Sequence, residues 1–302
     1  MTLNYSIIIP HRDSFELLKR ALDSVPDRSD IQIIIIDNTP YNIDFSKLGE
    51  KRKNKCQILY SDPEKGAGHA RNVGLKKVIC KWLLFLDADD FFSPGAFEQF
   101  DKYINSKFDI IYFSVTSVFS DNLGKVAERH IPYAKLVSEF VKGGKNAEDK
   151  LRYWHVSPWS KLIRTKFVLE NGIFFEEVPA SNDLMFSVKT GHFADKIWAD
   201  DFPAYIITVG PGSLTHTITV RNSRSRYCVF IRQYKFMEAI GKPDMRFNLM
   251  AYVLKSLRFG LNEFYWYLVT AHRKRVNIFL GSKRWPGVLL AYLFKGCKKN
   301  ML

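Results

Sequence analysis

Three aspartates, Asp87, Asp89 and Asp90, stand within four positions directly after the apolar run at 83–86. Carboxylates at the end of a buried strand are costly to desolvate and repel one another unless a cation or hydrogen-bond donors stabilise them. Hard divalent cations bind carboxylate oxygens, and Mg²⁺ or Mn²⁺ typically keeps substrate phosphates among its other ligands. The pattern predicts a site for a metal ion and a diphosphate. The alternative is an acidic loop whose aspartates cap the next helix.

A glycine-containing segment, residues 64–74, follows one predicted strand and opens a predicted helix. Glycines at such a position let the main chain approach a ligand, and a helix N-terminus favours anions. Arg71, within this segment, can reach a phosphate or a carboxylate of the acidic loop. The spacing differs from the Gly-x-Gly-x-x-Gly dinucleotide fingerprint, so the segment alone is a weak indication.

Asp37 is the third candidate, because it follows the apolar run at 31–36 and lies next to the corner formed by residues 10–13. A carboxylate at the mouth of a sheet can accept a hydrogen bond from an N–H group of a nucleobase. The residues Asp-Asn-Thr-Pro at 37–40 are equally consistent with a simple turn.

The elements that must position these residues alternate between strands and helices. Short apolar runs rich in β-branched residues predict strands that are buried on both faces of a parallel sheet, at 5–10, 31–36, 56–60 and 81–86. Apolar residues at helical spacing predict helices over 14–24 and 67–79. In such an open α/β sheet, ligands bind beyond the carboxyl ends of the strands, which is where the candidate residues lie.

The second half of the chain is less regular. Its pattern predicts strands over 109–119 and 203–209, a turn at 121–124, and helical structure over 160–170 and from about 222 onwards. Ser181 is expected to cap a helix that continues to about Ala194. Residues 131–150 are polar and fit no single element.

Taken together, these pieces resemble the inverting glycosyltransferases of family 2, which have the GT-A fold, over roughly residues 4–217. The motifs that carry the resemblance lie in the same order as in the family, at 6–10, 33–37, 66–74, 85–90, 159–163, 171–175, 182–186 and 211–216. The family moves a sugar from a nucleotide-diphosphate donor to an acceptor hydroxyl and inverts the anomeric carbon.

The resemblance implies an open, mostly parallel sheet flanked by helices. It implies a GT-A catalytic domain over 1–220, with a nucleotide-sugar half over about 1–118 and an acceptor half over about 119–220. Residues 221–302 are expected to form a basic, aromatic, helical C-terminal region.

The resemblance also assigns roles to the matching positions. Pro10 and Asp37 would frame the nucleobase, Asp87 would contact the ribose and the sugar, and Asp89 would hold Mg²⁺ or Mn²⁺ against the diphosphate. The remaining donor contacts would come from Arg12, Gly66, Arg71 and Ala88.

Two later residues receive roles in the same way. Asp183 matches the general base that deprotonates the acceptor hydroxyl. The alternative interpretation is that Asp183 is a first-turn helix residue that the helix dipole stabilises. His216 matches a metal-binding histidine that many GT-A enzymes carry late in the chain. The alternative interpretation is a surface histidine that follows a strand.

The sequence departs from the family pattern at three places. The residues after Pro10 are His-Arg-Asp instead of a hydrophobic residue with Tyr-Asn, and residues 37–40 replace Asp-Asp-Gly-Ser. Both changes touch the nucleotide pocket, so the base is not identified, although a UDP-sugar is expected. The third change puts Asn182 in place of the usual glutamate and keeps Asp183.

Charge is distributed unevenly along the 302 residues. Residues 221–302 hold 17 Lys and Arg against 3 Asp and Glu, whereas residues 1–220 hold 28 of each sign. The asymmetry indicates an anionic partner for the C-terminal region, and an anionic membrane surface is the expected one. The alternative is a helical subdomain that packs its aromatic residues on the core or on a second subunit.

The predicted function is sugar transfer to a glycan or lipid-linked acceptor in cell-surface polysaccharide synthesis. Alternatives are a sugar-nucleotide nucleotidyltransferase, a non-catalytic binder of anionic polymers and a transferase that has lost turnover. Nothing in the charge-neutral first 220 residues favours nucleic acid. Because the four cysteines are scattered and the sequence shows neither a basic–apolar leader nor an apolar run of ~18 residues, we expect a cytoplasmic protein. The basic C-terminal region would place it peripherally on the inner face of the membrane. The oligomeric state stays open.

Overall fold

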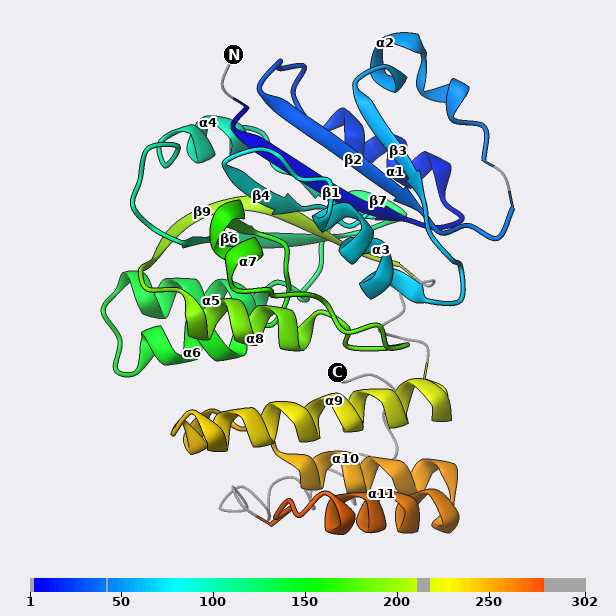
Figure 1. Cartoon of the computed structure of the whole chain (residues 1–302), viewed down its shortest axis with the longest axis vertical. Helices are drawn as coiled ribbons and strands as arrows, with labels where there is room; N and C mark the ends of the chain where they lie inside the picture. The colour runs from blue at the N-terminus through cyan, green and yellow to red at the C-terminus, as the bar shows by residue number, and fades with distance from the viewer. Residues whose placement is uncertain (1–2, 42, 211–217, 280–302) are drawn as a thin grey trace. The chain divides into compact units, whose positions relative to one another are not determined.

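A computed structural model describes residues 3–41, 43–210 and 218–279, and the chain divides into two compact units, Met1–Thr217 and Ile218–Leu302 (Figure 1). The first unit is an α/β structure built on one curled sheet. The second unit is helical in its described part.

The first unit begins with alternating strands and helices. Their bounds are β1 Tyr5–His11, α1 Phe15–Asp23, β2 Ile31–Asp37, the 3₁₀ turn η1 Phe45–Leu48, α2 Glu50–Lys53, β3 Cys56–Tyr60, α3 Gly66–Leu75 and β4 Trp82–Phe85. All four strands are parallel, in the order β3-β2-β1-β4. Their carboxyl ends therefore meet at one edge of the sheet, as the sequence predicts.

The sheet continues from β4 with strands of both directions. The remaining elements of the unit are β5 Phe91–Phe92, α4 Ala96–Asp101, β6 Ile110–Phe119, β7 Asn122–Val126, α5 Ile131–Val141, α6 Ala147–Trp154, β8 Lys161–Arg164, α7 Thr165–Glu170, α8 Leu184–Phe193 and β9 Ile197–Val209. The order is β3-β2-β1-β4-β8-β6-β9-β5, with β7 paired to β6. Strand β8 is antiparallel to both β4 and β6, whereas β9 runs parallel to β6.

Both faces of the sheet are covered, which explains why its strands are apolar at consecutive positions. Helices α1 and α4 pack on one face, where Leu22 and Phe100 join a cluster with Ile7 and Trp82. Helices α3, α5, α6, α7 and α8 pack on the other face, where Phe186 of α8 joins a second cluster. Figure 1 shows α5, α6 and α8 side by side along this second face.

The structure corrects three expectations about single elements. Residues 160–170 are not one helix, because Leu162 and Ile163 are buried in strand β8 before α7 begins. The predicted turn at 121–124 lies largely within β7. The helix predicted over 67–79 ends at Leu75, with Lys76 as its C-cap.

The ambiguous and strand-like segments of the second half also resolve. Residues 131–150 contribute α5 and the first half of α6, and the strand expected over 203–209 begins earlier, at Ile197. The helix predicted to start at Ser181 starts at Leu184, with Asp183 at the N-cap position. Ser181 instead has a left-handed main chain with φ of 59°.

The described part of the second unit is helical. It contains α9 Val220–Ala239, the 3₁₀ turn η2 Pro243–Met245, α10 Leu249–Ser256, the 3₁₀ turn η3 Leu257–Phe259 and α11 Leu261–Arg273. Its interior includes the tilted ring pair Tyr227 and Tyr267, with centroids 4.5 Å apart. Across the described ranges, no helix combines the length and the apolar content that crossing a bilayer requires.

Candidate active site

The acidic loop that follows β4 brings its three carboxylates together. One oxygen from each of Asp87, Asp89 and Asp90 lies within 4.8 Å of the others. Asp90 is already satisfied by the protein, because its oxygens accept hydrogen bonds from the Tyr205 hydroxyl at 2.9 Å and the Thr208 main-chain N–H at 2.7 Å. Burial, together with the charges of the other two aspartates, raises the pKa of Asp90 well above its ordinary value.

Asp89 differs from Asp90 in what surrounds its carboxylate. Arg20 and Thr208 donate to the main-chain oxygen of Asp89, each at 2.6 Å, and no side chain in the described ranges donates to its carboxylate. Burial and the charge of Asp87 raise the pKa of Asp89. A partly buried carboxylate that receives no side-chain donor from the described residues, in a cluster of oxygen ligands, has the chemistry that a hard divalent cation requires, so these residues fit a Mg²⁺ or Mn²⁺ ion.

Arg71 of α3 connects the acidic loop to the segment that precedes α8. Its guanidinium donates to Asp87 Oδ1 at 2.6 Å and to Asn182 Oδ1 at 2.9 Å. Although burial opposes its charge, the carboxylates of Asp87 and Asp183 raise the pKa of Arg71. Arg71 is therefore a fixed, buried cation between the acidic loop and the start of α8.

Asp183 lies at the N-cap position of α8, but its side chain makes no capping hydrogen bond. Its main-chain oxygen accepts from Ser187 N–H at 3.0 Å, which continues the helix. Burial raises the pKa of Asp183 and the charge of Asp87 raises it further, whereas Arg71 and Lys161 lower it. The site therefore contains a desolvated carboxylate that is not used to cap its own helix.

Close packing between α3 and residues 175–182 holds this arrangement. A Cβ on Gly68 would lie 2.2 Å from the Glu176 carbonyl oxygen, so only glycine lets the two segments approach this closely. Asn72 then clamps Phe175 from both sides, donating to its carbonyl oxygen at 3.0 Å and accepting from its N–H at 2.8 Å. The glycine-containing segment thus holds the main chain that leads to Asp183, the candidate base, and its Arg71 bonds to the acidic loop.

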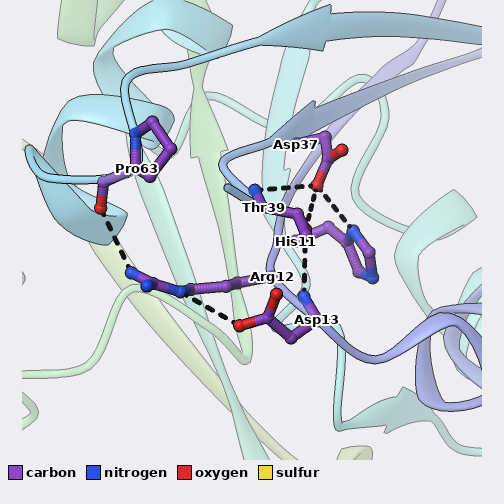
Figure 2. A network of polar contacts seen from close by, with 6 residues as sticks. All are labelled: His11, Arg12, Asp13, Asp37, Thr39 and Pro63. Atoms are coloured by element: carbon purple, nitrogen blue, oxygen red, sulfur yellow. Dashed lines mark hydrogen bonds and ion pairs between the residues drawn. The ribbon is translucent and has the colours of Figure 1, made fainter. Parts of the chain in front are cut away.

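A second network lies at the carboxyl ends of β1 and β2 (Figure 2). His11 Nδ1 lies 3.0 Å from Asp37 Oδ1, and the same oxygen accepts from the N–H and the hydroxyl of Thr39 at 3.2 and 2.6 Å. Asp37 is only 2% exposed. Burial opposes its charge, yet the bonds from His11 and Thr39 lower the pKa of Asp37. Any hydrogen bond from a nucleobase would have to go to Oδ2.

Arg12 extends away from Asp37 toward Pro63, as Figure 2 shows. It donates to the Pro63 carbonyl oxygen at 3.1 Å and lies 3.3 Å from Asp13 Oδ2, with half of its side chain exposed. Asp13 has a left-handed main chain, with φ of 57°, and its N–H donates to the Thr39 hydroxyl at 3.0 Å. The departure from the family pattern after Pro10 therefore forms a defined local structure.

The structure groups the predicted site residues in two places within the first unit. Asp87, Ala88 and Asp89 share the acidic loop, and Arg71 links that loop to the start of α8. Pro10, Arg12 and Asp37 lie at the ends of β1 and β2, and Gly66 begins α3 with φ of 71°. His216 lies outside the described residues.

Sequence reasoning missed Tyr205 and Thr208 of β9, which bond to Asp90 across more than 110 positions. It also missed the burial of Lys161, although the surrounding motif at 159–163 was singled out. No local pattern marks these residues, because their partners become neighbours only when the sheet forms.

Fold and site together define an α/β protein with an acidic loop and a glycine-opened helix at one sheet edge. The sequence profile of Glycosyl transferase family 2 matches residues 6–170, more than half of the chain. The chain therefore belongs to glycosyl transferase family 2, as the motifs predict.

Two curated relatives are similar over the catalytic region. The Bacillus subtilis glycosyltransferase EpsJ, itself uncharacterised, is 26% identical over 217 residues, which cover 70% of this chain and 62% of EpsJ. The Staphylococcus aureus poly(ribitol-phosphate) β-N-acetylglucosaminyltransferase TarS is 22% identical over 205 residues, or 65% of this chain and 34% of TarS. The matches thus span less than two thirds of either relative.

Solved structures share the fold. S. aureus TarS 1-349 in complex with UDP-GlcNAc superposes with a TM-score of 0.70 and 19% identity, covering 96% of this chain and 87% of that one. The Pyrobaculum calidifontis mannosyltransferase PcManGT, solved with GDP-Man and Mn²⁺, has a TM-score of 0.54 and 13% identity, covering 98% and 87%. The predicted GT-A fold is confirmed.

Proposed function

We propose that this glycosyltransferase moves a sugar from a UDP-sugar to a hydroxyl group of a glycan or lipid-linked acceptor in cell-surface polysaccharide synthesis. The observation that carries the proposal is the bridge formed by Arg71, which holds the acidic loop beside the segment that leads into Asp183. Such a transfer needs a group that binds the diphosphate and a group that accepts a proton, close together. TarS, a similar protein, is named as a poly(ribitol-phosphate) β-N-acetylglucosaminyltransferase and has been crystallised with UDP-GlcNAc, which supports the same class of donor.

In this proposal, Asp89 binds a Mg²⁺ or Mn²⁺ ion and Asp87 contacts the ribose and the sugar. The Mn²⁺ present in the structure of PcManGT supports a divalent ion of this kind. When bound, such an ion neutralises the charge that develops on the departing diphosphate. Asp90 keeps the loop in place, because both of its oxygens bond to β9. His216 is proposed as a further ligand, on the family resemblance alone.

Asp183 is proposed to accept the proton of the acceptor hydroxyl. Burial raises the pKa of Asp183, which makes its carboxylate a stronger base than an exposed aspartate. The acceptor oxygen then attacks the anomeric carbon from the face opposite the diphosphate, and that carbon is inverted. This single displacement requires no nucleophilic side chain, and we assign none.

The nucleotide is proposed to bind across the ends of β1 and β2 and the start of α3. Pro10 and Asp37 frame the base, while Arg12, Gly66, Arg71 and Ala88 contribute to the donor site. Asp37 Oδ1 is occupied by His11 and Thr39, so Oδ2 is the oxygen proposed to accept from uracil. Residues 1–118 thus form the proposed donor half, and 119–220 the proposed acceptor half.

A donor panel tests the proposal. The chain is incubated with UDP-sugars and a mixed pool of glycan and lipid-linked acceptors, and released UDP is measured. A parallel reaction contains nucleoside triphosphates and a sugar phosphate, and released pyrophosphate is measured. UDP release that depends on acceptor supports the transfer; pyrophosphate release alone would instead establish the nucleotidyltransferase, which the family match does not favour.

The basic second unit is proposed to bind an anionic membrane surface, where a lipid-linked acceptor would be available. Residues 221–302 hold 17 Lys and Arg against 3 Asp and Glu. In the described part of this unit, Leu261 and Tyr265 are largely exposed one helical turn apart on α11. Exposed apolar groups combined with basic residues are typical of helices that lie in a membrane interface.

A further inference from the structure

His11 is the last residue of β1, and its side chain is buried at the carboxyl end of that strand. In the parallel register of β1 and β2, His11 is paired with Asp37, so the two side chains project from the same face of the sheet. The Nδ1 atom of His11 lies 3.0 Å from Oδ1 of Asp37, as Figure 2 shows. The ring also makes a T-shaped contact with Phe45, with centroids 6.1 Å apart. The imidazole is therefore held between an aromatic neighbour and a carboxylate.

The chemistry of this contact identifies its donor. Burial opposes the charge of Asp37, but the bond from His11 counters burial most, and the pKa of Asp37 lies below its ordinary value. An ionised carboxylate can only accept, so Nδ1 carries the hydrogen and donates to Oδ1. The other ring nitrogen, Nε2, is buried and has no hydrogen-bond partner within the part of the chain that the structure describes. The bond to Asp37 is thus the polar contact that holds this ring.

Two departures from the family pattern meet at this carboxylate. The pattern has a hydrophobic residue at position 11 and glycine at position 39, and neither has a side chain that can donate a hydrogen bond. This chain has His11 and Thr39 instead, and both donate to Oδ1 of Asp37, the Thr39 hydroxyl at 2.6 Å. The same hydroxyl accepts from the N–H of Asp13 at 3.0 Å. The replaced residues therefore form one network around the carboxylate that is proposed to contact the base.

The two donors hold the carboxylate in different ways. Thr39 lies two positions after Asp37 in the same turn, so its bonds orient the carboxylate within that turn. His11 comes from another strand and directly follows Pro10, which is proposed to frame the base together with Asp37. The bond from His11 therefore fixes Asp37 relative to Pro10. Figure 2 shows no contact from the residues drawn to the second oxygen, Oδ2, which stays available for a ligand.

We propose that His11 is a positioning residue that fixes the Asp37 carboxylate for recognition of uracil, an inference that rests on the proposed UDP-sugar donor. A carboxylate selects a base with an N–H donor, because N3 of uracil carries a hydrogen whereas N3 of cytosine is an acceptor and repels it. A carboxylate that is already held in one orientation loses less freedom when it binds the base. The His11 side chain is fully buried, so it acts through Asp37 and not by contact with the nucleotide.

Nucleotide binding to the full chain tests the inference without requiring turnover. Dissociation constants of UDP and CDP are measured by isothermal titration calorimetry in the presence of Mn²⁺, and their ratio gives the base preference. The parent should bind UDP at least about tenfold more tightly than CDP, the scale of one hydrogen bond to a charged group. His11→Leu should weaken the binding of UDP by roughly tenfold and that of CDP by less than about twofold, because only uracil uses the fixed acceptor.

His11→Asn is the matched variant, because asparagine and leucine have nearly the same shape and the amide carries a donor near the place of Nδ1. It should restore most of the preference for UDP that His11→Leu loses. We expect His11→Leu to fold, since the family pattern has a hydrophobic residue at this position. If it does not fold, His11→Phe removes the donor and keeps a ring against Phe45. His272→Leu, which changes an exposed histidine of α11, should bind both nucleotides as the parent does.

The ratio of the two affinities separates positioning from a merely structural role, because a general loss of folded protein weakens the binding of both nucleotides alike. In turnover with a UDP-sugar, His11→Leu should raise KM by roughly tenfold and leave kcat unchanged, since the base is bound equally before and during the reaction. A ratio that stays at the parental value in His11→Leu would overturn this inference alone. A parent that binds UDP and CDP equally would refute the proposed contact between Asp37 and uracil, and this inference with it.

Discussion

The two acidic-loop carboxylates that are proposed to act on the donor, Asp87 and Asp89, differ mainly in their hydrogen-bond donors. Asp87 receives the Arg71 guanidinium at 2.6 Å, whereas no side chain in the described ranges donates to the carboxylate of Asp89. Asp89 can therefore take a cation without losing a side-chain hydrogen bond. Asp87 already has a positive partner, Arg71, which fixes the position of its carboxylate. A fixed carboxylate agrees with the proposed contact to the ribose and the sugar.

Asp89→Ala should reduce turnover by at least about a hundredfold, the scale of losing one electrostatic stabiliser of a leaving group. The measurement is UDP release with saturating Mn²⁺ or Mg²⁺. Asp23→Ala, which removes an exposed carboxylate at the end of α1, should leave turnover unchanged. Full activity of Asp89→Ala in the presence of EDTA would disprove the metal assignment.

Asp183→Asn should preserve the fold and donor affinity while lowering transfer by roughly a hundred- to ten-thousandfold, the usual contribution of a general base. In the parent, activity should fall as the pH drops through the pKa of Asp183, because a base must be ionised. That pKa is raised above the ordinary value of 3.8 by burial, so the limb lies above pH 3.8.

The control for this variant is Asp195→Asn, which changes an exposed aspartate just beyond the other end of α8. Its turnover and pH profile should match those of the parent. If Asp183→Asn transferred sugar to a defined acceptor at the parental rate, another group would have to be the base.

At the scale of elements, α3 and the segment before α8 act as one unit. Gly68 allows their main chains to touch, and Asn72 bonds to both main-chain groups of Phe175. Because Arg71 lies between these two residues on α3, any shift of the helix would move the cation that joins the acidic loop to Asn182. The contact therefore positions donor and base residues together.

Gly68→Ala should both destabilise the chain and lower turnover. The added Cβ would lie 2.2 Å from the Glu176 carbonyl oxygen, and overpacking of this kind typically costs about 1–3 kcal/mol. Urea unfolding and kcat measure the two effects. Gly124→Ala is the control, because its added Cβ meets only the Asn122 side chain at 3.4 Å, and it should change neither the stability nor kcat. A Gly68→Ala variant with the stability of the parent would contradict the close contact.

The sequence predicts best the elements that are defined locally. The isoleucine-rich β1 and β2 and the acidic loop were predicted because apolar runs and clustered carboxylates are visible without the fold. Strand β8 was predicted as part of a helix, because its burial depends on the neighbouring β4 and β6. The burial of Lys161 was missed for the same reason, since its partner Tyr112 on β6 is distant in the chain.

At the scale of the whole molecule, chemistry and charge are separated along the chain. Residues 1–220 carry equal numbers of acidic and basic residues and contain the candidate active site. The second unit carries the excess of positive charge, and its exposed residues include Leu261, Tyr265 and Phe279. A basic unit of this kind is attracted to anionic surfaces, which agrees with the proposed membrane-held acceptor.

If the second unit binds anionic membranes, the full chain should float with vesicles containing phosphatidylserine at low salt and detach at high salt. Replacing Arg273, Lys274 and Arg275, all exposed, by Gln should weaken binding by about a hundredfold, since each surface-adjacent cation contributes about 1 kcal/mol. The matched control neutralises three exposed lysines of the first unit, Lys47, Lys76 and Lys77, and should float as the parent does. The membrane proposal would be wrong if the parent stayed folded and transferred sugar to a soluble acceptor but never floated with the vesicles. The alternative, in which the basic region packs against protein, would then stand, because exposed cations would otherwise be attracted to the anionic lipids.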